Sequence, residues 1–434
     1  MVKTNCNFIF YLGLVLILST SGCKVKTDIG YPEITVLEPT PNAIFNNGDT
    51  IRFIAKFIDN SKLNNIELIL VNEANKPVLP MVSITPNKNP YTFQGDYVIS
   101  DPMLPGGQYY LNFKAYNEEN LTNKFIEIQI SDLAKEMLYP IIVTHPGTDK
   151  WDAYRLTSAN VWHNFFSNTG DYSGCAINPA ESQFYMCGNS ISNLTSVKLP
   201  EGLIKWNIKP VYHQSQRWFE GIESSYPNLY VSCAEGNIRG YNKEGSEVYK
   251  SETFPNAEPH HLTTTNNFIV GEFVDAYSND RFLVTFHNPG GKMFSSKFYD
   301  GNVIALLHSS LEKVLVLCNK DDEACIMQYD ATYNSLSNLH SFYEGIFIAA
   351  AKMDNDNYLI SSSVGVYHYR ISNNSLILFI SGIKDAKIAF DDTSQQFYIC
   401  SGKEMSIYSF PNPVLLNKIQ LPDTIVDFHL VFNK

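Results

Sequence analysis

The 434-residue sequence predicts an all-β protein, in which a β-sandwich is followed by a seven-bladed β-propeller. Three observations predict this class. Aromatic residues make up 13% of the chain, a composition that favours strands over helices. Short apolar runs separated by turn residues fill the part of the chain before residue 132. From there to the C-terminus, a strand pattern recurs at the spacing typical of propeller blades.

The chain begins with a segment typical of protein export. Lys3 is followed by an apolar run from Phe8 to Leu18, which is too short to span a bilayer comfortably. A secretory signal is therefore expected there in preference to a transmembrane helix.

The residues that follow this run, "TSGC", resemble a bacterial lipobox, in which small residues precede a cysteine that is lipidated and becomes the new N-terminus. Thr20 departs from the family pattern, which usually has Leu there. The alternative is a plain signal peptide with an ordinary thiol at Cys23. The resemblance implies a signal peptide over residues 1–22, a tether over 23–30, and a lipid anchor in the bacterial cell envelope, at the outer membrane on its periplasmic or surface face.

Residues 31–131 contain seven short alternating runs in about 100 residues, the spacing of a β-sandwich. In the run "GQYYLNFKA", Tyr109, Leu111, Phe113 and Ala115 alternate with polar residues. This run resembles strand F of an immunoglobulin-like or fibronectin-III-like domain, with Tyr109 at the position of the tyrosine corner. The Cys…Trp…Cys pattern of antibody domains is missing. Such modules usually act as spacers or interaction domains.

Residues 132–137 are expected to form the linker to a repeated region that extends over 138–434. Six related segments begin 45, 39, 46, 44 and 39 residues apart, which fits propeller blades of roughly 40–45 residues. Each is preceded by one short strand and followed by others, so the unit is a four-stranded blade. The six segments are "QFYMCGNSISNLTSVKL", "NLYVSCAEGNIRGYN", "NFIVGEFVDAYSNDRFLVTF", "KVLVLCNKDDEACIMQYD", "NYLISSSVGVYHYRI" and "QFYICSGKEMSIYSF".

The two ends of this region supply one more blade. Residues 425–433 read as an innermost strand with nothing after it, and residues 138–167 read as three outer strands with nothing before them. Pairing them closes the ring as seven blades and leaves no open sheet edge. Six blades is the alternative if 138–167 is a linker. The region resembles the WD40/YVTN-like propellers in architecture, but it lacks the Gly-His and Trp-Asp signatures of WD40 repeats, and Kelch and Asp-box motifs are also missing.

The six cysteines after Cys23 are expected to be structural rather than reactive. Cys187, Cys233, Cys318 and Cys400 fall at equivalent places in apolar strands, so they are expected to be buried. Cys318 and Cys325 flank a turn, where a disulfide is conceivable in an exported protein.

Composition and motifs exclude several classes of function. The formal net charge of −12 is dispersed, and the chain has no cluster of Lys and Arg, so a nucleic-acid partner is not expected. No zinc-site spacing, serine-hydrolase, metalloprotease or nucleotide-binding motif occurs. We therefore expect no catalytic residues, no metal and no cofactor.

The loops that lead into the innermost strands of a propeller gather round the mouth of its central channel, where ligands commonly bind. An Arg, a Trp and a His pair on one rim can hold a sugar or an anionic group through stacking and charge-assisted hydrogen bonds. The alternative for Trp218 is packing between blades. His260 and His261 are adjacent, so they are expected to point to opposite faces of a strand and not to share an ion. The candidate ligand-binding residues are Arg217, Trp218, His260, His261, Tyr343, Glu344 and Asp385.

The sequence therefore predicts a membrane-anchored lipoprotein whose propeller binds a carbohydrate or a protein without catalysis. One alternative is a propeller enzyme that acts on polysaccharide as a lyase or glycoside hydrolase. Its residues would be Glu344, Asp385, His260 and Arg217. A second alternative is an architectural surface protein with no small ligand.

Overall fold

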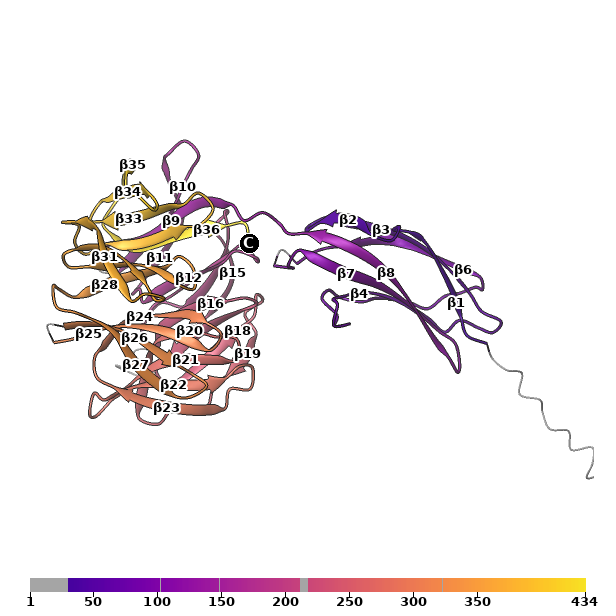
Figure 1. Cartoon of the computed structure of the whole chain (residues 1–434), viewed down its shortest axis with the longest axis horizontal. Coiled ribbons are helices and arrows are strands. Elements are labelled where there is room, and N and C mark those ends of the chain that lie inside the picture. Colours follow the sequence, from indigo (N-terminus) through magenta and orange to yellow (C-terminus); the bar gives the residue numbers. More distant parts are fainter. Residues whose placement is uncertain (1–29, 102, 148, 211–217, 322) are drawn as a thin grey trace, which may run out of the picture. The chain divides into compact units, whose positions relative to one another are not determined.

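The computed structural model describes residues 30–101, 103–147, 149–210, 218–321 and 323–434, which form strands, turns and loops and contain no helix. The all-β prediction is thus confirmed for the part of the chain described. No helix long and apolar enough to cross a membrane occurs in these ranges. The chain divides into two compact units between Leu133 and Ala134 (Figure 1).

The first unit consists of two sheets that share one core. Alternate residues of β3 are buried, as expected for a strand with one face on the core. Phe53 on β3, Phe93 on β6, Phe113 on β7 and Ile128 on β8 all belong to the core cluster, which joins the two sheets. The three-stranded sheet is β1 (Glu33–Glu38), β3 (Thr50–Ile58) and β6 (Tyr91–Val98). The five-stranded sheet is β2 (Ala43–Asn46), β8 (Leu121–Ser131), β7 (Gly107–Tyr116), β4 (Asn65–Val71) and β5 (Val82–Ile84).

The second unit contains seven four-stranded antiparallel sheets within the described residues. Six of them are formed by consecutive strands. In order from the inner to the outer strand, these are β12 (Gly174–Asn178), β13 (Gln183–Cys187), β14 (Leu194–Lys198) and β15 (Leu203–Ile208); β16 (Phe219–Ser225), β17 (Asn228–Cys233), β18 (Asn237–Tyr241) and β19 (Glu247–Lys250); β20 (Ala257–Thr264), β21 (Phe268–Asp275), β22 (Arg281–His287) and β23 (Met293–Tyr299); β24 (Asn302–Ser310), β25 (Lys313–Lys320), β26 (Glu323–Asp330) and β27 (Ser335–Phe342); β28 (Phe347–Lys352), β29 (Asn357–Ser362), β30 (Gly365–Arg370) and β31 (Ser375–Ser381); and β32 (Lys387–Asp391), β33 (Gln396–Ser401), β34 (Glu404–Ser409) and β35 (Leu415–Gln420).

The remaining sheet joins the two ends of the unit. Its order is β36 (Ile425–Phe432), β9 (Met137–Gly147), β10 (Lys150–Leu156) and β11 (Trp162–Thr169), so the last strand of the chain pairs with the first strand of the unit. The six-blade alternative, in which 138–167 is a linker, is wrong because these residues form three strands of a complete sheet.

The inner strands contact one another in a closed circle, which makes the unit a β-propeller, as predicted. β12 contacts β16, and contacts continue through β20, β24, β28, β32 and β36 back to β12. Gly221 allows β16 and β20 to approach each other closely, because a β-carbon at this position would lie 1.9 Å from the carbonyl oxygen of His260 on β20. The circle places the inner strands, one from each sheet, around a common centre.

The middle of each sheet supplies the core between neighbouring sheets. The second strands are almost entirely buried, whereas outer strands such as β15 and β35 are mostly exposed. Cys187, Cys233, Cys318 and Cys400 lie on these second strands and are at most 1% exposed, which confirms the expected burial. Cys318 and Cys325 are directly opposite each other on β25 and β26, and both are free thiols.

Candidate functional site in the central cavity

A cavity of about 410 Å³ lies among four of the seven inner strands, and we call it the central cavity. Small side chains line part of its wall, because β28 carries three consecutive alanines, Ala349–Ala351, and β32 carries Ala389. The exposed lining surface is nevertheless mainly polar, with charged side chains from β28, β32 and β36. The lining residues are Ile304, Ala305, Ile348, Ala349, Ala350, Ala351, Lys352, Lys387, Ile388, Ala389, Phe390, Asp427, Phe428, His429, Leu430 and Phe432.

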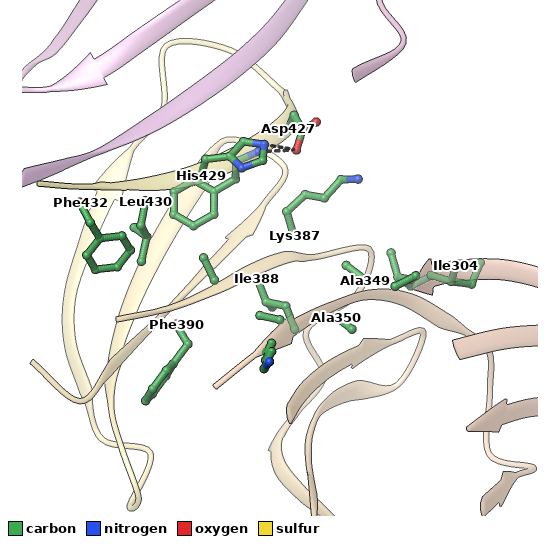
Figure 2. Close-up of a pocket in the computed structure, with 16 residues that line it drawn as sticks. Ile304, Ala349, Ala350, Lys387, Ile388, Phe390, Asp427, His429, Leu430 and Phe432 are labelled. Atoms are coloured by element: carbon green, nitrogen blue, oxygen red, sulfur yellow. Dashed lines mark hydrogen bonds and ion pairs between the residues drawn. The ribbon is translucent and has the colours of Figure 1, made fainter. Parts of the chain in front are cut away.

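Three of the four charged side chains of the central cavity lie on its side formed by β32 and β36, and the fourth is Lys352 at the end of β28. Figure 2 shows the Lys387 side chain extending along the same side as the paired Asp427 and His429. The Nε2 atom of His429 is 3.4 Å from Oδ1 of Asp427. These two residues are two positions apart on β36 and so project to the same face of the strand.

Two side chains at and just before β12 complete this polar group. Tyr172, just before β12, donates its hydroxyl proton to Oδ2 of Asp427 at 3.0 Å. The Cys175 thiol, on β12, is buried, and its sulfur lies within 4.8 Å of both a carboxylate oxygen of Asp427 and a ring nitrogen of His429. Four residues lie where β36, the last strand of the chain, meets β12. We call them the seam cluster: Tyr172, Cys175, Asp427 and His429.

Within the seam cluster, the pKa values of Asp427 and His429 are shifted in opposite directions, and each shift favours the charged form. Burial alone would raise the pKa of Asp427, but His429, Lys387 and the backbone N–H of Phe428 outweigh it and lower that pKa to about 2. Burial alone would lower the pKa of His429, yet Cys175 and Asp427 raise it well above its usual value. The result is a charged pair beside the cavity.

Burial also acts on the two other members of the seam cluster. It raises the pKa of the Cys175 thiol, and the nearby Asp427 carboxylate adds to the increase. For Tyr172, burial and Asp427 together raise the pKa well above 10. Both groups therefore keep their protons at neutral pH unless a cation approaches them.

Lys387 lies near enough to Asp427 to lower the pKa of that carboxyl, but it forms no direct ion pair with it. No carboxylate of the described residues lies within 4.0 Å of its ammonium group, whereas Lys403 and Lys418 each form an ion pair at 2.9 and 2.7 Å. Its ammonium group therefore remains available to an anion that enters the central cavity.

The residues that the sequence predicts at the channel mouth lie at different places in the structure. Arg217 and Cys23 lie outside the described residues. Trp218 is 6% exposed and lies in a core cluster with residues of two neighbouring sheets, such as Tyr185 and Val231, so it packs between blades. His260 and His261 lie within β20 and not in the loop before it.

The two histidines face different carboxylates. Nδ1 of His260 is 3.8 Å from Oε2 of Glu220, and Nε2 of His261 is 3.9 Å from Oε2 of Glu272.

The other three candidates are exposed and lie before β28 and β32. Tyr343 is 74% exposed, Glu344 accepts a hydrogen bond from the Tyr367 hydroxyl at 3.1 Å, and Asp385 lies in a turn with φ of 51°. Within the described ranges, no hydrogen bond or ion pair links one member of the expected set to another.

Sequence reasoning assigned no ligand-binding role to Lys387, Asp427 or His429, and it expected Cys175 to be structural. One signal was available for two of them, because "IVDFHLVF" carries Asp and His at alternate positions of an otherwise apolar innermost strand. Charged groups on one face of such a strand need a polar environment, and here that environment is the cavity.

Comparison with known proteins identifies a fold and no family. No protein-family model and no curated protein matches this sequence. A solved structure of a protein from Lactobacillus plantarum has 10% identity and a TM-score of 0.50, and the match covers 68% of this chain and 99% of that one. At this identity the similarity bears on the fold alone.

Two further solved structures align at lower scores. A quinoprotein alcohol dehydrogenase-like protein from Bacteroides thetaiotaomicron has 14% identity and a TM-score of 0.47, over 93% of this chain and 99% of that one. A computationally designed protein has 12% identity and a TM-score of 0.49, over 66% of this chain and 86% of that one.

Proposed function

We propose that this chain is a non-catalytic binding protein, whose propeller takes a small anionic ligand such as an acidic sugar into its central cavity. The observation that carries the proposal is the ammonium group of Lys387 at the cavity, without an ion pair among the described residues. A volume of about 410 Å³ lies within the range of small-molecule sites. The small alanine side chains leave room for a ring, the mainly polar lining suits sugar hydroxyls, and the ammonium group suits a carboxylate.

The rest of the chain would place this propeller at the bacterial cell envelope. In this proposal Cys23 carries the lipid and the first unit is an immunoglobulin-like spacer. The immunoglobulin-like assignment is supported by the Tyr109 hydroxyl, which donates to the carbonyl oxygen of Pro105, four residues upstream, at 2.7 Å. That hydrogen bond is the one expected of a tyrosine corner.

The anchor is tested by growing cells with labelled palmitate. The wild-type chain is expected to incorporate the label, and Cys23→Ser is expected to lose it, because lipidation requires the thiol. Cys6→Ser is the matched control, since Cys6 lies in the segment that would be removed. Continued labelling of Cys23→Ser would reject the anchor.

The binding site is tested by isothermal titration of the protein with glucuronate and with glucose. We expect glucuronate to bind more tightly than glucose. Lys387→Gln is expected to weaken glucuronate binding by about tenfold or more, because a hydrogen bond to a charged group contributes roughly 1.5–3 kcal/mol. Lys384→Gln, which changes an exposed lysine before β32, is the matched control and should bind as the wild type does. Equal binding by Lys387→Gln and the wild type would disprove the role of Lys387.

A further inference from the structure

The seam cluster brings together three different metal-binding atoms. Cys175 supplies a sulfur, His429 a ring nitrogen and Asp427 a carboxylate oxygen, and all three atoms lie within 4.8 Å of one another. Asp427 and His429 share one face of β36, and Cys175 comes from β12, the neighbouring inner strand in the ring. Sulfur, imidazole and carboxylate are the three protein ligand types of Zn²⁺.

The surroundings of these atoms resemble those of a metal site with an open position. Cys175 is 5% exposed, so its sulfur faces the protein interior, while Asp427 and His429 both line the central cavity. Nε2 of His429 is buried and has no hydrogen-bond partner of good geometry within the described residues. This nitrogen is held beside Asp427 by charge attraction at 3.4 Å, and a metal ion between the two would replace that contact with coordination.

The carboxylate of this group is held in place by groups that would not themselves bind the ion. The Tyr172 hydroxyl donates to Oδ2 of Asp427 at 3.0 Å, and the backbone N–H of Phe428 donates to Oδ1 at 2.8 Å. The Tyr172 ring is fixed in turn against Trp151, with centroids 5.7 Å apart. Hydrogen bonds of this kind orient a metal ligand before the ion arrives.

We propose that Cys175, Asp427 and His429 bind one Zn²⁺ ion, with a fourth coordination position open to the central cavity. Binding releases the thiol proton of Cys175 and the imidazolium proton of His429 to the solvent, because both must coordinate in their deprotonated forms. The proposal goes beyond anion binding, and Lys387 supplies none of the three ligands.

The test uses the full chain in detergent, stripped with a chelator and then equilibrated with Zn²⁺ or Co²⁺. We expect one Zn²⁺ per chain by mass spectrometry of the metal, and a thiolate-to-cobalt charge-transfer band in the Co²⁺ form. Cys175→Ser is expected to lose that band and to bind Zn²⁺ at least tenfold more weakly. Tyr172→Phe keeps all three ligands, and we expect its Zn²⁺ affinity to fall about 10-fold, the lower end for loss of an orienting hydrogen bond.

Two control variants distinguish the seam cluster from a second thiol and from the anion site. Cys325→Ser removes a half-buried thiol on another sheet and should keep both the band and the wild-type affinity. Lys387→Gln removes a cation that lowers the pKa of Asp427, so this variant should bind Zn²⁺ at least as tightly as the wild type while it loses anion binding. Failure of anion binding and failure of metal binding can therefore be told apart.

Either of two results would overturn the proposal. One is wild-type Zn²⁺ affinity in folded Cys175→Ser and Asp427→Asn. The other is a wild-type Co²⁺ form without the sulfur charge-transfer band, which is decisive even where a variant fails to fold.

Discussion

Deletion of residues 425–434 is expected to abolish cooperative folding of the propeller unit. These residues include β36, the innermost strand of the sheet that joins both ends of the unit. Without β36, the hydrogen-bonding edge of β9 is left open at the centre of the ring, and the neighbouring inner strands β12 and β32 lose their contacts to it. The measurement is urea unfolding followed by circular dichroism, with size-exclusion chromatography to detect aggregates.

Single substitutions separate the effect of closure from that of shortening the chain. Phe428 is 6% exposed and packs on Tyr398 of the adjacent sheet, with ring centroids 6.2 Å apart. Phe428→Ala should therefore lower the free energy of unfolding by about 3–5 kcal/mol. Leu416→Ala, on the exposed outer strand β35, should change it by less than about 0.5 kcal/mol. A cooperative transition of wild-type midpoint in the deletion variant would show that closure by β36 is unnecessary.

Glu272→Gln is expected to lower the free energy of unfolding by roughly 3 kcal/mol, as for loss of one partner of a buried ion pair. The Glu272 side chain is 1% exposed and lies 2.7 Å from Nη1 of Arg281, and it accepts the hydroxyl proton of Tyr299 at 2.6 Å. Nε2 of His261 approaches the same carboxylate at 3.9 Å. The amide keeps the size of the side chain and removes its charge, so Arg281 loses its compensating carboxylate.

Urea unfolding of Glu272→Gln and of Glu404→Gln provides the comparison. Glu404 pairs with Lys418 at 2.7 Å, but both side chains are well exposed. Its loss should therefore cost no more than about 1 kcal/mol. Equal decreases in the free energy of unfolding of the two variants would mean that the buried Glu272 pair stabilises the protein no more than an exposed pair does.

The repeated sheets could be predicted from the sequence because they depend on local patterns. Apolar second strands, turn residues and a constant spacing mark each sheet within a window of about 45 residues. The closure of the ring was also accessible, because residues 425–433 read as a strand that lacks its sheet. The sheets are marked by residues close together in the sequence, and the closure is marked by a terminal strand with no partner nearby. Both features can be recognised in the sequence.

The seam cluster could not be predicted in the same way, because it depends on closure. Tyr172 and Asp427 are 255 positions apart and meet only when β36 returns to the start of the unit. The surroundings of the expected rim residues also depend on packing between sheets. Trp218 lies in a core cluster with residues of the sheets β12–β15 and β16–β19, and His260 and His261 face the carboxylates of Glu220 and Glu272.

The central claim is that an anion enters the central cavity and meets Lys387. The most direct measurement is an anomalous difference map from crystals of the protein soaked in selenate, an anion that selenium makes visible. The account predicts a selenium peak in the central cavity with its oxygens within hydrogen-bond distance of Nζ of Lys387. Selenium peaks confined to the outer surface, with none in the central cavity, would contradict it.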